Sequence, residues 1–454
     1  MAVDGREHLV IIGSGWAGLY IAQYIDTSHY AVSIVSPRRT SAYTPLLASA
    51  ACGLFPFSCA EESVRAKGRN CNFAKANALS IDFDTNRVQC EAAFDEDEDG
   101  FPSREFYLEY DQLIICPGCM LLSFTPVINL YTVLFLRLIT HMGLGQTNTF
   151  NTPGVSEHAL FMKHVSDAMS LRKKLFDQLE KASLPCTTAE EASALLHVAI
   201  VGGGPTGVEI TAELSDLAQN ELKDFYPAVA PLIHITIFDV ASNILGAYDK
   251  RLYEYATEQM AKRGVRVATN TTILQVDRTH LHVKGSDPVP YGMLLWVAGN
   301  KSIPFVDNLG VKKTSQGLVR IVTDSTLRVK KVGDGNGVYR NVFALGDAAD
   351  IDGQPLPTTA EVAVQKSKYL VRRLNSRFGR ERPFAFSNKR LVTYIGAHDG
   401  IIEGSAVDER WSGQKAWLSW RSGSFTWTRT WRNWVLIMWA MVMNFLFGRD
   451  VMRL

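Results

Sequence analysis

The sequence predicts an α/β fold built on two Rossmann-like domains, with a helical region at the C-terminus. Two apolar strands each run into a glycine-rich turn and then an amphipathic helix. The two units lie far apart in a chain of 454 residues, which is long enough for two or three domains. A tryptophan-rich, apolar tail follows residue 410 and predicts the helical region.

The first strand–turn–helix unit reads HLVIIGSGWAGLYIAQYI and contains Gly13, Gly15 and Gly18. The spacing G-x-G-x-x-G in this context is typical of a dinucleotide site. The first glycine permits a tight turn, the second lets the backbone approach a pyrophosphate, and the third allows close helix–strand packing. The free N–H groups and positive dipole end of the helix then face the phosphates.

The second unit reads LLHVAIVGGGPTGVEITAEL and contains Gly202, Gly204 and Gly207. One such motif is weak evidence, because glycine-rich turns also occur in α/β proteins that bind no nucleotide. Two motifs, each after a strand and before a helix, indicate two dinucleotide sites.

The second strand of each unit should end near an acceptor for a ribose hydroxyl. In HITIFDV that residue is Asp239, whose carboxylate accepts from a 2′-OH and repels a 2′-phosphate, which favours NADH over NADPH. Lys250 and Arg251 follow downstream, so the preference is not absolute. In AVSIVSP the corresponding residue is Ser36, which still accepts a hydrogen bond.

A late segment, NVFALGDAAD, predicts a strand that ends at Gly346 and Asp347. An aspartate at such a strand end can reach the ribityl and pyrophosphate region of a flavin. By itself the segment is an ordinary turn. Together with the two glycine motifs it indicates a flavoprotein that holds FAD in one domain and NADH in the other.

Composition excludes several other classes. The formal net charge of +1 and the lack of a basic stripe argue against nucleic acid as a partner. The seven cysteines show no even pairing, which indicates a reducing compartment. No metal-ligand cluster stands out. The N-terminus shows neither an export signal nor an arginine-rich presequence, so no targeting segment is visible.

Most of the chain resembles the type II (alternative, non-proton-pumping) NADH:quinone oxidoreductases, a family of flavoproteins with two dinucleotide-binding domains. The segments that carry the resemblance are SPRRTSAYTPLLASAACG, NTFNTPGVSEHALFMKHVSDAMSLRKKL, VGGGPTGVEITAEL, LPTTAEVAVQKSKYL and FGRDVMRL. The resemblance implies FAD-dependent oxidation of NADH with two-electron reduction of a membrane quinone and no proton pumping. The cofactor carries the chemistry, and the protein supplies alignment and electrostatics.

The resemblance assigns a site role to Glu209, which is expected on the first turn of the helix after the second glycine motif. The family has a glutamate here, close to where nicotinamide, flavin and quinone meet. The alternative is an acid that only suits the positive end of the helix.

The quinone-site helix departs from the family pattern. The family carries two glutamines four residues apart on one helix face, whereas this chain has Glu361 and Gln365, followed by Lys366 in place of a small or amide residue. Gln365 can bond a quinone carbonyl, but an ionised Glu361 cannot donate to one. Either Glu361 titrates in the site, or the acceptor is not ordinary ubiquinone, or Glu361 is a solvated helix residue.

Seven of the nine tryptophans lie after residue 410, interleaved with arginines. The apolar run from Trp434 to Phe447 is shorter than the roughly 20 residues that span a bilayer, so we expect it to lie in the membrane interface. The tryptophan and arginine flanks suit the headgroup level. The alternative is a buried core or dimer helix.

The apolar segment from Met120 to Gln146 has no counterpart in the family pattern. We interpret it as an unspliced intron translated in frame. A membrane span or a genuine insertion are the alternatives. The CxxC pair Cys116 and Cys119 next to it could be a redox pair, but it lies in a strand-end turn where the family needs no dithiol.

These observations predict a FAD-binding domain over residues 1–190, with the anomalous insertion 120–146, and its second part with the quinone-site helix over 316–389. The NAD-binding domain is expected at 191–315 and a membrane-anchoring region at 390–454. We expect a homodimer held peripherally at a membrane, the mitochondrial inner membrane by resemblance. Alternative functions are a flavoprotein reductase with another acceptor and a non-catalytic nucleotide-binding signalling protein.

Overall fold

The computed structural model describes residues 5–67, 69–94, 104–118, 149–333, 335, 337–376, 382–387, 391–404, 411–428 and 430–449. The chain forms two compact units. Unit 1 comprises Met1–Ser41, Ser63–Gln146 and Asn300–Ser387, and unit 2 comprises Ala42–Glu62, Thr147–Gly299 and Asn388–Leu454.

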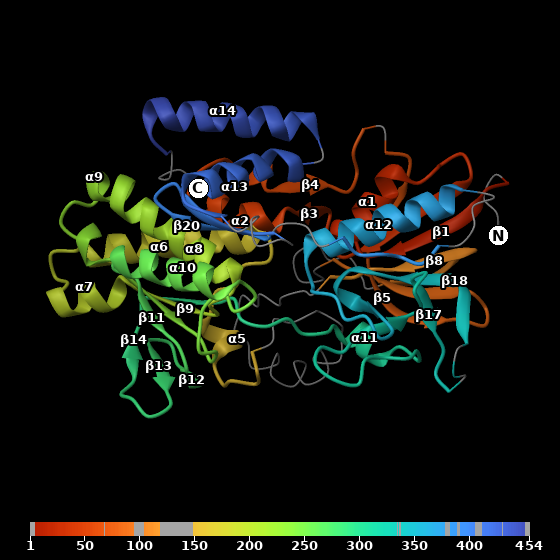
Figure 1. Ribbon diagram of the computed structural model, residues 1–454, viewed down its shortest axis with the longest axis horizontal. Coiled ribbons are helices and arrows are strands. Elements are labelled where there is room, and N and C mark those ends of the chain that lie inside the picture. Colours follow the sequence, from red (N-terminus) through yellow and green to blue (C-terminus); the bar gives the residue numbers. More distant parts are fainter. Residues whose placement is uncertain are drawn as a thin grey trace. The chain divides into compact units, whose positions relative to one another are not determined.

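Unit 1 is organised around one ten-stranded mixed sheet (Figure 1). Five neighbouring strands, β18, β8, β1, β2 and β5, run parallel, as in a Rossmann domain. In spatial order the strands are β19 (Ala349–Ile351), β16 (Ile321–Thr323), β17 (Arg328–Lys330), β18 (Val338–Ala344), β8 (Gln112–Ile115), β1 (Glu7–Ile12), β2 (Tyr30–Ser36), β5 (Asn72–Asp82), β6 (Arg87–Ala92) and β7 (Glu105–Glu109).

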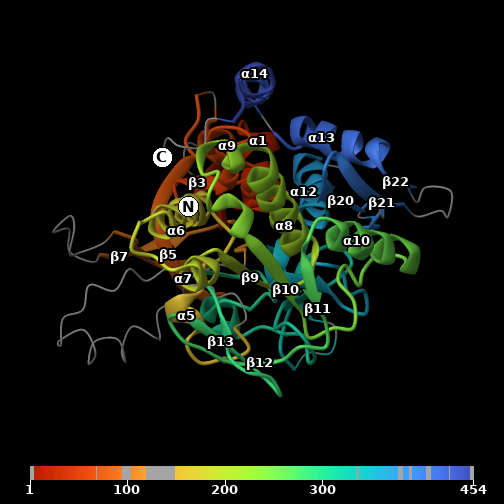
Figure 2. The same ribbon diagram turned by 90° about the vertical axis from the view of Figure 1, so that its left-hand side faces the viewer.

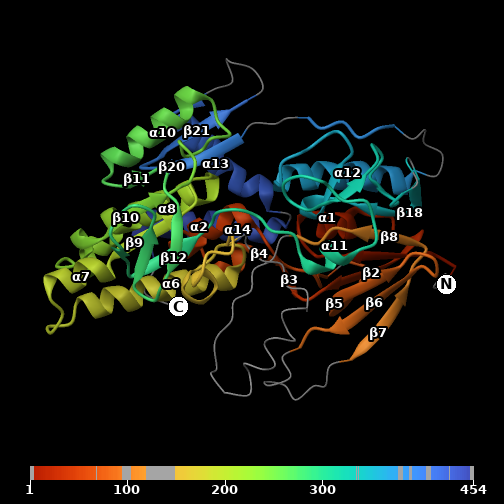
Figure 3. The same ribbon diagram turned by 90° about the horizontal axis from the view of Figure 1, so that it is seen from below.

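The parallel strands of unit 1 are buried on both faces. Along β1, Leu9 and Ile11 enter one hydrophobic core while Val10 and Ile12 enter the other, because successive side chains point to opposite faces. Helices α1 and α12 lie side by side over the first core (Figures 1 and 3), and α11 covers the second. Their bounds are α1 (Trp16–Tyr24), α11 (Pro304–Asn308) and α12 (Ala360–Asn375), and the short helix η5 (Gly346–Ala348) links β18 to β19.

Unit 2 holds a second parallel sheet, formed by β11 (Arg266–Ala268), β10 (His234–Phe238), β9 (His197–Val201) and β15 (Met293–Trp296). Two antiparallel sheets accompany it, β12 (Ile273–Val276) with β13 (His280–Val283) and β14 (Val289–Pro290), and β20 (Leu391–Gly396) with β21 (Asp399–Glu403) and β22 (Trp411–Ser412). The ribbon β3 (Thr40–Ala42) pairs with β4 (Glu61–Ser63).

The helices of unit 2 include short connecting turns and longer amphipathic elements. They are η1 (Thr44–Leu46), α2 (Leu47–Ala51), η2 (Phe57–Cys59), α5 (Val155–His158), α6 (Val165–Ala182), α7 (Ala189–Leu195), α8 (Pro205–Leu217), η3 (Ala218–Leu222), α9 (Lys223–Phe225), η4 (Ala230–Leu232), α10 (Lys250–Lys262), α13 (Gln414–Trp427) and α14 (Trp431–Phe447). Helix α8 packs against β20, and α13 covers β20 and β21 (Figure 2), so the C-terminal sheet is integral to unit 2.

The compact units do not coincide with the predicted domain ranges. Residues 42–62, 147–190 and 388–454 cluster with the second Rossmann sheet, and residues 300–315 cluster with the first. Buried hydrogen bonds explain the first grouping. Arg172 of α6 donates to the carbonyl of Ala51 (3.0 Å), and Gln178 donates to the carbonyl of Gly292 (2.6 Å). Hydrophobic periodicity along the chain carries no information on such long-range polar contacts.

The interpretations of the apolar segment 120–146 and of a CxxC redox pair concern residues outside the described ranges, since Cys119 and the segment both lie there. Cys116 is described and is buried next to the first glycine turn, where its Sγ lies 3.7 Å from the carbonyl oxygen of Gly13. Desolvation raises the pKa of its thiol to about 12. The thiol of Cys116 is therefore protonated and poorly nucleophilic at neutral pH.

Two candidate nucleotide sites and a buried carboxyl group

The first glycine turn, between β1 and α1, has the shape of a phosphate cradle. Gly13 has a φ of +106°, and a Cβ there would lie 2.6 Å from the carbonyl oxygen of Cys116. A Cβ at Gly18 would collide with the carbonyl oxygen of Gly13. At Gly15, the N-cap of α1, a Cβ would meet nothing within 4 Å. Two glycines thus close the turn, and the third leaves open space at the helix N-terminus for a pyrophosphate.

The second turn, between β9 and α8, repeats this arrangement. Gly202 has a φ of +115°, and a Cβ there would lie 2.8 Å from the backbone nitrogen of Ala298. Gly207 sits against the carbonyl oxygen of Gly202, whereas Gly204, the N-cap of α8, faces open space. In both turns an added Cβ would clash at the first and third glycines and would meet nothing within 4 Å at the N-cap glycine, so both turns leave room for the pyrophosphate of a dinucleotide.

The ends of the second strands differ between the units. Ser36 ends β2, is buried, and accepts a hydrogen bond from the hydroxyl of Ser14 (2.8 Å). Asp239 follows β10 directly, and its carboxylate accepts from the backbone N–H groups of Gly203 (2.5 Å) and Ala241 (2.8 Å). The carboxylate of Asp239 is thereby held against the glycine turn, where a ribose would lie.

In unit 1, the carboxyl end of β18 lies at the same edge of the sheet as the first glycine turn. Strands β18, β8 and β1 are parallel, so their carboxyl ends meet. Gly346, in η5 after β18, has a φ of +76°, and a Cβ there would lie 3.8 Å from the Cβ of Ala17 in α1. Asp347 follows and is half-buried. The structure thus brings Gly13 and Gly346 to one edge, in the arrangement that a flavin dinucleotide requires.

Glu209 lies one turn further along α8 than the sequence indicated. The helix begins at Pro205, directly after the cap Gly204, so Glu209 is its fifth residue and no acid lies in the first turn. The expectation of a first-turn position was wrong, because proline at the first helical position starts the helix immediately after the glycine turn. An interaction with the free N–H groups of the helix end is therefore a weaker explanation for this residue.

The carboxyl group of Glu209 is held by the C-terminal helix α13. Trp420 donates from its Nε1 to Oε1 of Glu209 (3.0 Å). Desolvation raises the pKa of Glu209 to about 8, against the opposing effect of the Trp420 hydrogen bond. Glu209 is thus a carboxyl group that stays largely protonated at neutral pH.

A cavity of about 270 Å³ lies over this carboxyl group. Its size is close to the lower end of small-molecule pockets, roughly 300–1,000 Å³. It suits one ring system rather than a whole dinucleotide. The cavity is lined by Thr44, Pro45, Leu46, Ala48, Met162, Pro205, Thr206, Glu209, Val392, Ser419, Trp420 and Gly423.

Sequence reasoning missed the network that supports Trp420. The ring of Trp420 stacks on Tyr394 with centroids 4.8 Å apart, and the Tyr394 hydroxyl donates to Asp216 of α8. Asp216 also accepts from Arg263 (2.5 Å) and from the backbone N–H of Ala397 (3.0 Å). These contacts join residues far apart in sequence, and the only local signal was the clustering of tryptophans in the tail.

Glu361 and Gln365 lie in the first turns of α12, in unit 1, and contact each other. Gln365 donates from Nε2 to Oε1 of Glu361 (2.7 Å) and to the carbonyl of Ser387 (2.8 Å), and its own carbonyl accepts from the Ser387 N–H (3.1 Å). The helix is capped by Thr359, whose hydroxyl accepts from the N–H of Val362. The predicted pairing of these two side chains on one helix face is therefore present.

The chain is similar to known proteins in both sequence and fold. The family model described as pyridine nucleotide-disulphide oxidoreductase matches residues 7–367. A probable NADH dehydrogenase of Dictyostelium discoideum is 30% identical over 98% of this chain and 91% of its own length. A mitochondrial internal alternative NAD(P)H-ubiquinone oxidoreductase of Solanum tuberosum is 32% identical over 99% of this chain and 89% of its own length.

Among solved structures, NDH2 from Plasmodium falciparum in complex with NADH superposes with a TM-score of 0.84 at 23% identity. The superposition covers 99% of this chain and 100% of that one, so the similarity of fold extends over both units.

Proposed function

The chain belongs to the pyridine nucleotide-disulphide oxidoreductases and, within them, to the alternative, non-proton-pumping NADH:quinone oxidoreductases, and from this premise we propose roles for the residues of its two sites. It is an FAD-dependent enzyme that oxidises NADH and reduces a quinone by two electrons. FAD, when bound, supplies the hydride and electron chemistry, and the protein supplies binding, orientation and protons.

Unit 1 is assigned to FAD and unit 2 to NADH. The open N-terminus of α1 at Gly15 would hold the FAD pyrophosphate, and Asp347 would accept from the ribityl chain. The open N-terminus of α8 at Gly204 would hold the NADH pyrophosphate. Asp239 would accept from the 2′-OH of the adenosine ribose, which disfavours the additional phosphate of NADPH.

Glu209 is the proposed proton donor to the quinone. A quinone takes up two protons with its two electrons, and its ring must lie where a protonated group can reach its oxygen. Glu209 lines a cavity that suits one ring, in contact with Trp420, and it is mostly protonated at neutral pH. This half-buried, mostly protonated carboxyl group in a ring-sized cavity is the observation that carries the proposal.

Gln365 and Glu361 are proposed to orient the quinone from α12. The two N–H groups of the Gln365 amide donate to Glu361 and to the Ser387 carbonyl, so a quinone oxygen that accepts from Gln365 would replace the Ser387 carbonyl as its partner. Glu361→Gln would restore the pair of glutamines expected of the family. We expect it to lower the KM for a short-chain ubiquinone and leave the KM for NADH unchanged.

The exposed side of α14 is proposed to bind the surface of a membrane, the mitochondrial inner membrane in the cell, as part of a homodimer. Among the described residues, no helix has the length and hydropathy needed to cross a bilayer. Relatives from Solanum tuberosum and Arabidopsis thaliana carry mitochondrial names. Large apolar side chains are nevertheless exposed along α14: Trp431, Trp434, Val435, Met438, Trp439, Val442, Phe445, Leu446 and Phe447. Aromatic residues with a nearby arginine, Arg432, suit the headgroup level.

Cosedimentation with anionic vesicles tests this attachment. The triple variant Trp431→Ser, Trp439→Ser and Phe445→Ser should lose at least tenfold in vesicle affinity, whereas Trp411→Ser, exposed but outside α14, should not. Unchanged vesicle binding of the triple variant, together with a fall in mass from dimer to monomer, would instead assign this surface to the subunit interface.

Anaerobic stopped-flow mixing tests the proposed function. The FAD-loaded enzyme should bleach on mixing with NADH and regain its flavin absorbance on mixing with a short-chain ubiquinone. Bleaching without recovery would contradict quinone reduction and leave only an NADH-oxidising flavoprotein. Glu209→Gln should bleach normally and recover slowly.

A further inference from the structure

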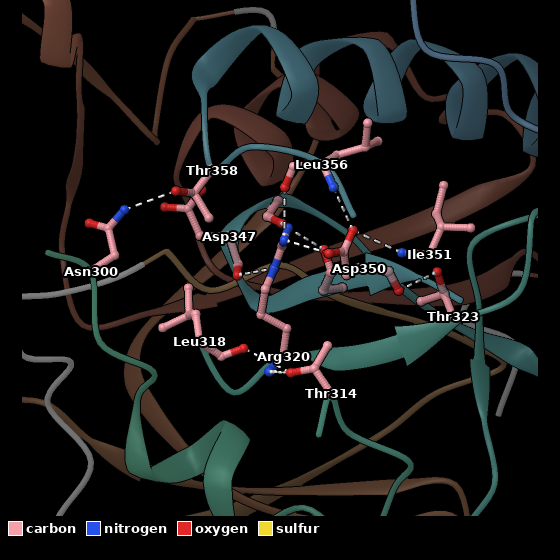
Figure 4. A network of polar contacts seen from close by, with 12 residues as sticks. Asn300, Thr314, Leu318, Arg320, Thr323, Asp347, Asp350, Ile351, Leu356 and Thr358 are labelled. Carbon is pink, nitrogen blue, oxygen red and sulfur yellow. Dashed lines mark hydrogen bonds and ion pairs between the residues drawn. The ribbon is translucent and has the colours of Figure 1, made fainter. Parts of the chain in front are cut away.

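Two cationic side chains are buried beneath the turn at Gly346, and Figure 4 shows the first of them. One is Arg320, which is 5% exposed and lies just before β16. Its guanidinium donates to the carbonyls of Asp347 (3.2 Å), Gly346 (3.4 Å), Ala349 (2.7 Å) and Leu356 (2.9 Å). Arg320 therefore fixes the turn η5 from the protein interior, because its guanidinium donates to backbone carbonyl oxygens of the turn.

The carboxylate of Asp350 neutralises Arg320. Its Oδ2 lies 2.8 Å from Nη1 of Arg320. Its Oδ1 accepts from the backbone N–H groups of Ile351 (3.0 Å) and Leu356 (3.2 Å), as Figure 4 shows. Both oxygens of Asp350 are thus occupied, and this pair accounts for one of the two buried positive charges.

The second cation, Lys366 of α12, is fully buried at 0% exposure. Within the described part of the chain, its ammonium donates one hydrogen bond, to the carbonyl of Ala349 (3.2 Å), and forms no ion pair. Burial and the charge of Arg320 lower the pKa of Lys366 to about 8, while Asp350 and Asp347 oppose this, so the ammonium is still mostly protonated at neutral pH.

An ammonium with three donors and one neutral acceptor is costly to bury. Lys366 also lies on the buried stripe of α12, four residues from Val362 and four from Leu370, a position that an apolar residue would fill without this cost. A methionine at this position would pack without the free-energy cost of a buried charge. The free protein thus carries a destabilising charge that an anionic ligand at the turn would offset.

The backbone N–H groups of the turn that could bind such a ligand lie on the side away from the two cations. Arg320 and Lys366 engage the carbonyls of Gly346, Asp347 and Ala349 from the interior. In a trans peptide the N–H points opposite to the carbonyl, so the N–H groups of Asp347 and Ala348 face away from the two cations. That side of the turn adjoins α1, through the approach of Gly346 to Ala17.

We propose that Lys366 is a positioning residue for the flavin, a fixed positive charge beneath the Gly346–Ala348 turn that stabilises the anionic, two-electron-reduced form of bound FAD over the oxidised form. The inference rests on the proposed function in one respect, the assignment of FAD to unit 1. A cation close to the flavin raises its reduction potential, because the reduced form carries more negative charge. Lys366 would thereby favour electron transfer from NADH.

The reduction potential of bound FAD tests this directly, by anaerobic titration against redox dyes. Lys366→Met removes the charge and the hydrogen bond, and Lys366→Gln removes the charge but keeps a donor for Ala349. In both variants the ratio of affinities for reduced and oxidised FAD should fall about tenfold, which is about 30 mV for a two-electron couple. Lys368→Met, an exposed lysine on the same helix, should leave the potential unchanged.

The melting temperature of the FAD-free protein shows whether the variants fold. Lys366→Met should melt at the same temperature as the wild type or higher, because an uncompensated buried charge is gone. Unchanged potentials in both variants with FAD bound would overturn the proposal. A shift in Lys366→Met alone would also overturn it, since the hydrogen bond and not the charge would then act.

The measurement is independent of turnover. It needs only bound FAD and a dye, so a wild-type enzyme that fails to reduce quinone would refute the proposed function while the potentials still decide the role of Lys366. A wild-type protein that binds no FAD would refute the assignment of FAD to unit 1.

Discussion

The two Rossmann units share one backbone frame but differ in the charged side chains that lie next to their proposed sites. In unit 1 the buried cations Arg320 and Lys366 donate to backbone carbonyls in the segment that follows β18. In unit 2, Glu209 of α8 is half-buried and lines the cavity, and Glu213 and Asp216 further along the same helix are almost fully buried, as is the cation Arg172 of α6. The shared frame fits the proposed binding of a dinucleotide pyrophosphate in each unit, and the different charged groups fit the different steps proposed for the two units. Cations suit an electron-rich cofactor, and a neutral carboxyl group stores a proton.

The acids of α8 also join the C-terminal segment to the rest of unit 2. Glu213 accepts from Ser49 (2.6 Å) and lies 3.4 Å from Arg449, while Asp216 contacts Tyr394 and Arg263. In unit 1 the buried Arg320 fixes the turn η5 through backbone carbonyls. In unit 2 the buried Asp216 fixes Tyr394, on which the cavity residue Trp420 stacks. Variants that change one unit without the other test this comparison.

The largest effect is expected for Arg320→Met. Removing the guanidinium leaves the Asp350 carboxylate buried without its partner and releases four carbonyl contacts. The free energy of unfolding should fall by about 3–5 kcal/mol, with loss of FAD. Denaturant unfolding measures this, with the exposed Arg340→Met as the control. The double variant Arg320→Met with Asp350→Leu should recover part of the loss, and a cost below about 1 kcal/mol in the single variant would contradict the account.

Glu209→Gln is expected to slow one half-reaction. Loss of a positioned proton donor costs roughly 100-fold, so the rate of flavin reoxidation by quinone should fall by about that factor. Flavin reduction by NADH should stay within about twofold, because the glycine turn and Asp239 are unchanged. Glu190→Gln, an exposed acid on α7, serves as the control. Equal slowing of both half-reactions would mean that Glu209 shapes the cavity and donates no proton.

Asp239→Asn is expected to affect only the binding of the nicotinamide dinucleotide, which is assigned to unit 2. The variant loses the charge that repels a 2′-phosphate and weakens the contact with the ribose. We expect the KM for NADH to rise about tenfold, equivalent to about 1.4 kcal/mol, with little change or a decrease for NADPH. The bound FAD should be unaffected. Asp224→Asn, exposed on α9, is the matched control, and an unchanged ratio of NADH to NADPH efficiency would exclude Asp239 as the ribose acceptor.

The smallest effect is expected for Trp420→Phe. Phenylalanine keeps the stacking on Tyr394 but removes the N–H that stabilises the ionised carboxylate of Glu209. The pKa of Glu209 should therefore rise by about one unit, since a hydrogen bond to a charged group contributes about 1.5 kcal/mol or more. The rate of quinone reduction should therefore begin to fall at a pH about one unit higher than in the wild type. Trp417→Phe on the same helix should leave the profile in place.

Much of the fold could be predicted from the sequence because its signals are local. Each glycine motif with its strand and helix spans about 20 residues, and the structure has both turns where the spacing placed them. The unit boundaries and the cavity could not be predicted in the same way. Trp420 and Glu209 lie 211 residues apart, and Tyr394 and Asp216 lie 178 apart, so no window of sequence contains either pair.

Lys366 shows a different limit. A lysine beside a glutamine is typical of a solvated helix face, and only the buried positions on either side of it, Val362 and Leu370, indicate that it faces the core. Glu209 was identified through family resemblance, whereas its protonation follows from burial beneath α13, which the sequence does not reveal.

The pH dependence of flavin reoxidation by a short-chain ubiquinone tests the central claim most directly. A carboxyl group donates a proton only in its protonated form, and the pKa of Glu209 is raised to about 8. In the wild type the rate constant should therefore be level below about pH 8 and fall about tenfold per unit above it, and in Glu209→Gln it should be low and flat across the same range. The same alkaline fall in Glu209→Gln would contradict the assignment of Glu209 as the proton donor.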